Sequence, residues 1–361
     1  MTDLLYSDVE AHLRASVRSA LAQRSPVSAV LAGVESGQPF DRDLWQTLAG
    51  EMGLAGIAVP ERFGGGGASL REAAVVLEEL GRGIAPVPYL SSAVVATTVL
   101  LACEGVAQEL AALAAGEAVA VLAIPFAFGP GAVVEPVAVD GQGRLTGTVN
   151  GVADALAATL LLVPAVDGLY LVDATTVDRS PLVSLDLTRP LADLRLNGVA
   201  GRRIATVVEA VAAVDAGVTA GAALLASEQL GVAEWCLEAT VAYLQERRQF
   251  ARPLGSFQAL KHRLADVWVE LTQARAVARH AAVCAADGDP DLPVAASLAQ
   301  AFCSPVAVHA AEEAVQLHGG IGFTWEHPVH LFLKRAKADA IAFGTADRHR
   351  VNLAGLVDLP A

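Results

Sequence analysis

The sequence predicts a mainly helical α+β fold in which one block of strands separates two blocks of helices. Apolar residues recur at helical spacing up to about residue 118, short β-rich runs follow, and long helical patterns fill the rest. Of the 361 residues 54% are hydrophobic and 18% charged, which is too apolar for disorder and enough for a large core. We therefore expect an N-terminal α-helical domain over 1–118, a middle β domain over 119–207 and a C-terminal four-helix bundle over 208–361.

The first block contains three helical patterns. Residues 6–23 and 41–52 place apolar side chains three and four positions apart, as one face of a helix requires. Residues 69–82 open with a Ser-x-x-Glu capping box. The four consecutive glycines at 64–67 are not followed by the Lys-Ser/Thr of a phosphate-binding loop, so we predict a flexible turn between helices there.

The middle block predicts a small antiparallel sheet or barrel of roughly 90 residues. Its β-rich runs are punctuated by Gly, Pro and Asp, and the Gly-Gln-Gly-Arg segment at 141–144 is typical of a hairpin turn. This pattern does not resemble the alternating βαβ units of a nucleotide-binding Rossmann domain.

The last block predicts four helices with apolar stripes, over 213–248, from 257 onward, over 293–317 and from about 328. Helices of this kind pack as a bundle. Phe343, Gly344 and Thr345 follow as a turn at a helix end.

Charge and cysteine spacing exclude several classes of function. A net charge of −14 argues against nucleic acid, while local basic clusters at 247–248 and 334–350 fit a small anionic ligand. The four cysteines show no Cys-x-x-Cys or Cys/His ligand spacing, so we predict neither a metal site nor disulfides. The N-terminus is unlike a signal peptide, and the apolar run at 156–165 is too short to span a bilayer, so we expect a cytoplasmic protein.

Two motifs in the last block suit a phosphate-bearing ligand. Arg247 adjoins a Pro-Leu-Gly turn, and a guanidinium can hold a phosphate through two parallel hydrogen bonds. Gly319 and Gly320 have no Cβ to keep a ligand away from the backbone. Together with the segment 53–82, the motifs Arg-x-Gln-Phe…Pro-Leu-Gly-x-Phe-Gln and Gln-x-x-Gly-Gly-x-Gly-Phe resemble the acyl-CoA dehydrogenase family over nearly the whole chain.

The resemblance implies an FAD enzyme that oxidises acyl-CoA thioesters to trans-2-enoyl-CoA. In the family a glutamate removes the α-proton while a hydride moves to flavin N5, and we expect electron-transfer flavoprotein as the acceptor. The resemblance also implies which residues contact FAD: Arg247, Gln249, Phe250, Gln258, Gln316, Gly319, Gly320 and Thr345.

The sequence departs from the family where the chemistry should occur. Phe343 stands where most members carry the catalytic glutamate, and a phenyl ring cannot accept a proton. A minority carries the base on the first long helix of the last block, near Gly221, and the nearest carboxylate there, Glu228, is about two turns or roughly 10 Å away. The family's Thr-Glu-Pro-x-Ala-Gly-Ser-Asp loop reads AIPFAFGPGAVVEP at 123–136, which has no Ser, Thr or Asp to bond the flavin.

Three hypotheses follow. The chain resembles the subunit that lacks the catalytic glutamate in α2β2 family members, which act on CoA thioesters of steroid side chains, and it would lend FAD contacts to a homologous catalytic subunit. Alternatively it is a homo-oligomeric dehydrogenase whose base has moved to Asp339, Asp347 or Glu228, although a solvated charge is the simpler interpretation of Asp347. The third hypothesis is a scaffold without a redox role.

Four further residues invite an interpretation. His318 could pair with an FAD phosphate, but we expect a local hydrogen bond at a helix end. His262 and His309 are expected to be structural, and Trp325 is expected to pack a loop at a subunit junction.

Overall fold

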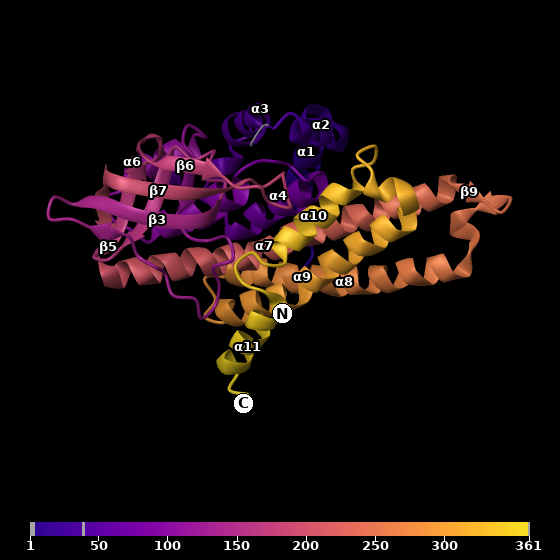
Figure 1. The fold of residues 1–361 in the computed structure, drawn as a ribbon. Coiled ribbons are helices and arrows are strands. Elements are labelled where there is room, and N and C mark those ends of the chain that lie inside the picture. Colours follow the sequence, from indigo (N-terminus) through magenta and orange to yellow (C-terminus); the bar gives the residue numbers. More distant parts are fainter. Residues whose placement is uncertain (1–3, 38–39, 360–361) are drawn as a thin grey trace.

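Three long helices form the axis of the molecule: α7 (Val207–Glu246), α8 (Gln258–Asp287) and α9 (Leu292–His318). In this computed structural model, which describes residues 4–37 and 40–359, α7 and α9 run in the same direction and α8 runs antiparallel to both, with the sheets at one end and a narrow tip at the other (Figure 1). Two shorter helices complete the block, α10 (Val329–Asp339) and α11 (Ala346–Leu356), and α11 projects away from the body with the C-terminus. The predicted order of helices, strands and helices is confirmed.

The N-terminal helices form one block, part of which packs against α7. They are α1 (Asp8–Arg24), α2 (Val27–Glu35), α3 (Arg42–Trp45), α4 (Leu70–Gly83), α5 (Thr97–Leu101) and α6 (Ala107–Ala114), with π-helical segments at Gln46–Glu51 and Leu90–Ala96. The predicted capping box starts α4, because Ser69 and Glu72 bond each other's backbone. Helix α4 crosses α7 closely, since a Cβ on Gly231 would lie 1.9 Å from the carbonyl oxygen of Glu78.

The four glycines at 64–67 form a tightly packed turn, so the prediction of a flexible turn was wrong. The Gly66 and Gly67 N–H groups donate to backbone carbonyls of the preceding turn, and a Cβ on Gly65 would lie 2.1 Å from the carbonyl oxygen of Val59. The glycines allow backbone to pack against backbone.

The middle block folds into two four-stranded sheets. One has the order β1-β4-β5-β8 and the other β2-β3-β7-β6. The strands are β1 (Ala120–Leu122), β2 (Ala138–Val139), β3 (Arg144–Ala153), β4 (Leu160–Ala165), β5 (Gly168–Asp173), β6 (Asp178–Pro181), β7 (Leu191–Ala200) and β8 (Arg202–Ala205).

The hairpin predicted at 141–144 joins β2 to β3. The expectation of a wholly antiparallel sheet was wrong, because β1 pairs with β4 in parallel. The domain boundaries at 118 and 207 stay a prediction.

Two segments are long and apolar enough to cross a membrane by length and composition alone, Val207–Glu246 and Leu292–Phe323. More than half of each apolar window is buried inside the protein, 56% and 67%. They are therefore core helices of the bundle.

Candidate functional site

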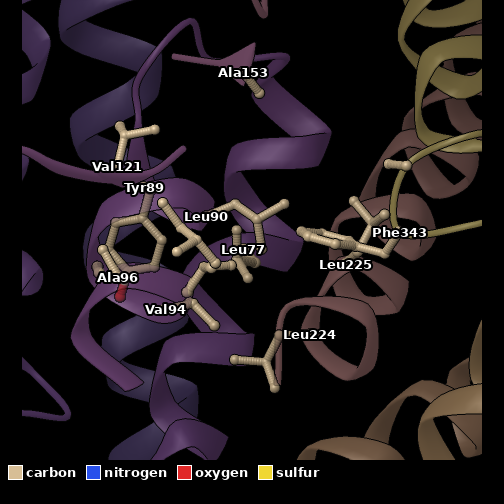
Figure 2. Close-up of a cluster of buried hydrophobic side chains, with 14 of the residues drawn as sticks. Leu77, Tyr89, Leu90, Val94, Ala96, Val121, Ala153, Leu224, Leu225 and Phe343 are labelled. Carbon is tan, nitrogen blue, oxygen red and sulfur yellow. The ribbon is translucent and has the colours of Figure 1, made fainter. Parts of the chain in front are cut away.

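The turn between α10 and α11 places Phe343 in the interior. Its backbone is left-handed (φ 52°), its N–H donates to the carbonyl of Phe126 at 2.9 Å, and its own carbonyl accepts from Nε2 of His349 at 2.9 Å. The side chain is 6% exposed. Figure 2 shows it reaching from the turn towards Leu225 of α7 and the apolar cluster around Leu90. Hydrogen bonds to its N–H and to its carbonyl thus fix the backbone of Phe343 and with it the direction of the ring.

The ring of Phe343 lies directly on Gly221 of α7. A Cβ added at Gly221 would be 2.8 Å from Cζ of the ring, a separation that requires a neighbour to move. The two places that the sequence comparison predicted for a base, Phe343 and the neighbourhood of Gly221, therefore meet in space, and a phenyl ring fills the point of contact.

The loop at 123–136, which the sequence comparison matched to the family's flavin-contacting loop, also packs against this turn. The rings of Phe126 and Phe343 are 6.2 Å apart and edge to face, and a Cβ on Gly129 would lie 2.0 Å from the carbonyl oxygen of Phe343. What remains is a cavity of about 30 Å³ lined mostly by apolar side chains, with room for only one or two water molecules.

A buried ionic network lies behind the two phenyl rings. Arg189, in the segment between β6 and β7, donates to Glu228 of α7 at 2.6 Å and to Asp339 of α10 at 2.7 Å. Its guanidinium also lies 5.6 Å from the ring centre of Phe126. The network thus joins the sheet region to two helices of the bundle.

Arg335 of α10 completes the network. It donates to Asp186 at 2.6 Å, to Glu228 at 2.5 Å and to the hydroxyl of Thr188 at 2.6 Å. Arg189 and Arg335 hold the pKa of Glu228 below its usual value although burial opposes this.

Two guanidinium groups in this network face three carboxylates, so one proton balances the charge. Asp339 is the carboxylate to carry it: its side chain is fully buried and its Oδ2 has no hydrogen-bond partner among the described residues. Burial, followed by the charge of Glu228, raises the pKa of Asp339 to about 8.

The three carboxylates considered as relocated bases lie in unsuitable places. Glu228 and Asp339 are bonded within the network and are almost fully shielded from solvent. The side chain of Asp347 is 89% exposed and pairs with Arg350 at 2.5 Å. None of them is aimed at the cavity beside Phe343.

Three basic side chains of the cluster predicted at 334–350 are paired with carboxylates, and its predicted fit to an anionic ligand stays a prediction. Arg335 is buried in the network, Lys337 pairs with Glu312 at 2.6 Å, and Arg350 pairs with Asp347. The sequence showed the positive charges but not the carboxylates that fold against them.

Seven of the eight predicted FAD contacts lie towards the end of the bundle remote from the sheets (Figure 1). We call them the distal set: Arg247, Gln249, Phe250, Gln258, Gln316, Gly319 and Gly320. All seven are exposed. The eighth, Thr345, lies apart from them, beside the Phe343 turn, where its hydroxyl caps α11 by accepting from the N–H of Arg348 at 3.4 Å.

The tip of the bundle is a two-residue hairpin between β9 (Arg248–Gln249) and β10 (Arg252–Pro253). Both loop residues, Phe250 and Ala251, have left-handed backbones (φ 53° and 62°), which suit the twist of a hairpin but are uncommon without glycine. As a result the side chain of Phe250 is 83% exposed at the extreme end of the molecule.

The second part of the distal set surrounds the C-terminus of α9. Gln316 lies in its last turn, and Gly319 (φ 65°) ends it and begins the 3₁₀ helix η7 (Gly319–Phe323). Apart from their chain neighbours, no described residue comes within 4 Å of a Cβ position on Gly319 or Gly320, so their backbone faces open space.

The structure places the remaining candidates as follows. His318 makes the expected local bond, from Nδ1 to the carbonyl of Ala314 at 2.7 Å. His309 pairs with Glu270 at 2.7 Å, in keeping with a structural role, and His262 is exposed. Trp325 packs edge to face on His330; whether it lies at a subunit junction stays a prediction.

Arg189, Arg335 and Phe126 are the site residues that motif comparison missed. The only signal in the sequence was the spacing of Arg335 and Asp339, two ionisable residues four positions apart in an apolar helical pattern, which puts both on one face. The sequence did not show that Arg335 and Asp339 would contact residues of the segment between β6 and β7 and of α7.

The comparisons with known proteins agree with this architecture. The model of the acyl-CoA dehydrogenase C-terminal domain matches residues 211–355, and that of the N-terminal domain matches residues 7–117. Acyl-CoA dehydrogenase IpdE2 of Mycobacterium tuberculosis is 38% identical over 330 residues, which cover 91% of each chain. Acyl-CoA dehydrogenase FadE27 of the same organism is 34% identical over 335 residues, 86% of each chain.

Two solved structures also match over almost the full length. A chain of the ChsE4-ChsE5 complex from Mycobacterium tuberculosis has a TM-score of 0.87 and 29% identity and covers 100% of both chains. A chain of the Tcur3481-Tcur3483 steroid ACAD has a TM-score of 0.85 and 31% identity, with 97% of this chain and 98% of that chain covered.

Proposed function

Because the chain belongs to the acyl-CoA dehydrogenase family, we propose that it is the subunit without a catalytic base in a heteromeric, FAD-dependent acyl-CoA dehydrogenase. In this assembly the homologous partner holds the flavin ring and supplies the base, and the present chain contributes the distal set to the diphosphate and adenine end of that FAD. The observation that carries the proposal is the contrast between a buried phenyl ring at Phe343, where the family would carry its base, and an exposed distal set.

Each of the chain's own residues has a stated part in this proposal. FAD, when bound, accepts the hydride from the acyl chain. Arg247 presents a guanidinium suited to two parallel hydrogen bonds with a phosphate. Gly319 and Gly320 let the ligand approach the backbone, and Phe250 offers an aromatic face. Phe343 occupies the space in which this chain's own base and substrate would have to meet.

The assembly and the substrate class are supported by the two matching structures. One is the complex of ChsE4 with ChsE5. The other is named as a steroid ACAD and carries a double name, Tcur3481-Tcur3483. We therefore propose a bulky CoA ester such as a steroid side chain as substrate, and electron-transfer flavoprotein as acceptor.

The test is co-expression with candidate homologous subunits, followed by measurement of flavin retention and of acyl-CoA oxidation. Replacing Arg247 by Ala in the complex should lower FAD affinity about tenfold or more, because a charge-assisted contact to a phosphate is lost. Arg195→Ala, at an exposed arginine on β7, is the matched control and should change nothing. A chain that alone binds one FAD per protomer and oxidises an acyl-CoA would refute the proposal.

A further inference from the structure

The distal set comes from two different helices, and an aromatic stack connects them. Tyr243 lies one turn before Arg247 on α7, and its carbonyl accepts the N–H of Arg247 at 2.8 Å. Its ring stacks on His318 of α9, with centroids 4.5 Å apart and planes 25° apart. His318 lies between Gln316 and Gly319 in the chain, so a single ring-to-ring contact relates the two halves of the set.

A third ring extends the stack. His327, in the segment that leads into α10, lies 4.5 Å from His318 with the planes tilted by 42°. His318 is therefore held between Tyr243 on one element and His327 on another, and it is 3% exposed.

The hydrogen bonds define the protonation of both histidines. Nδ1 of His318 must carry its proton, because its partner at 2.7 Å is the carbonyl of Ala314, which can only accept. Nε2 of His318 is buried without a partner in the described part of the chain. Nδ1 of His327 accepts the N–H of Val329 at 3.3 Å, so its proton lies on Nε2. Both rings are neutral in this arrangement.

A second proton would turn His318 into a charged imidazolium. The new N–H, on the buried Nε2, would have no hydrogen-bond acceptor, and a buried charge without a partner is costly. Consistent with this, burial lowers the pKa of His318. The pKa of His327 is also lowered, mainly by burial and to a smaller extent by the neighbouring His318.

The neighbouring charged groups offer His318 no compensation. Neither of its ring nitrogens bonds a carboxylate in the residues that the structure describes. The nearby carboxylates of α9 are engaged elsewhere, Glu312 with Lys337 and Glu313 with Arg263. The other titratable side chains near the stack are Tyr243 on α7, the exposed Glu326 and His327 before α10, and His330 and Lys334 on α10.

We infer that neutral His318 is the positioning residue of the distal set: its ring fixes the end of α7 against the end of α9, and adding a proton to it releases the hairpin tip. The inference rests on the proposed function for what the set binds, but the geometry of the set can be tested in this chain alone. His318 acts through Arg247 and Gln316 and does not itself touch the cofactor.

The first experiment is hydrogen–deuterium exchange of the tip, residues 244–256, in the purified chain at pH 7.5 and pH 5.5, corrected for intrinsic rates. We expect faster exchange of the tip at the lower pH in the wild type. In H318F, which keeps a planar ring that cannot take a proton, we expect slow exchange at both pH values. In H318A we expect fast exchange at both. H309F, at a histidine paired with Glu270, is the control and should behave as the wild type.

Two results would overturn the inference. One is a pH response of the tip that persists unchanged in H318F, because it would then belong to another group. The other is a tip in H318A that is as protected as in the wild type, with melting curves showing that both variants are folded.

The second experiment links the stack to the heteromer. There, H318A should weaken FAD binding about tenfold, the size expected when an aromatic pair is lost, and H318F should retain most of the affinity. Equal affinities of H318A and wild type would contradict the inference. A heteromer that retains no FAD with any variant would instead count against the proposed function, while the exchange measurements would still decide the role of His318.

Discussion

The ring of Phe343 is held by contacts from three separate parts of the chain. The loop at Phe126 bonds its N–H, His349 of α11 bonds its carbonyl, and Gly221 of α7 leaves the space that the ring fills. These contacts make the residue part of the core rather than a side chain at the edge of an empty pocket.

We predict that Gly221→Ala destabilises the protein by about 1–3 kcal/mol, because the added methyl group overpacks against the ring. In a Phe343→Ala background the same change should cost clearly less. The coupling in this double-mutant cycle, measured by urea unfolding, should be at least about 1 kcal/mol. Additive effects would mean that the two residues do not touch.

We predict that Phe343→Glu does not create an active enzyme from this chain alone. The new carboxylate would be buried beside Phe126 and Leu225, and loss of the ring together with an unpaired charge should cost about 3 kcal/mol or more. Thermal unfolding and an acyl-CoA oxidation assay measure both effects, with Phe343→Leu as the folded control. Robust turnover by the glutamate variant would contradict the proposal that this chain cannot act as a dehydrogenase by itself.

Among the elements, the segment between β6 and β7 is joined to α7 and α10 by Arg189 and Arg335. A buried network of this kind gains little net stability when complete, but it is costly to break because the remaining charges lose their partners. Its role here is to hold the sheet segment against the bundle behind the Phe343 turn.

Asp339→Asn tests the protonation of this network. The folded-state pKa of Asp339 is raised to about 8, above its value in the unfolded chain, so its contribution to stability is complete below the unfolded pKa and is lost as pH rises through about 8. Asparagine cannot ionise. We therefore expect unfolding free energies measured between pH 5 and pH 9 to fall with pH more steeply in the wild type than in the variant. Parallel curves would show that Asp339 is ionised throughout.

The elements themselves were largely predictable from sequence. The capping box of α4 and the hairpin before β3 depend on neighbouring residues, so local patterns sufficed. The parallel pairing of β1 with β4 and the compact glycine turn at 64–67 depend on contacts between distant segments, which local patterns do not encode. Helix α11 was missed because the pattern from 328 was interpreted as one helix that leads into a turn.

For the molecule as a whole, motif comparison identified the Phe343 turn and the distal set, but not which of their residues lie close together in space. It identified Phe343 and Gly221 as the two possible base positions, and folding brings them into direct contact. It also grouped Thr345 with the distal set, whereas α10 and the turn after it separate Thr345 from Gly319 and Gly320. Sequence distance gave no guide to either result, because both depend on how the long helices pack.

The most direct test of the account is flavin stoichiometry, measured by absorbance and mass spectrometry of the native protein. We predict no FAD on this chain alone, and one FAD for each pair of one copy of this chain and one catalytic homologue. One FAD per protomer of this chain purified by itself would contradict the account.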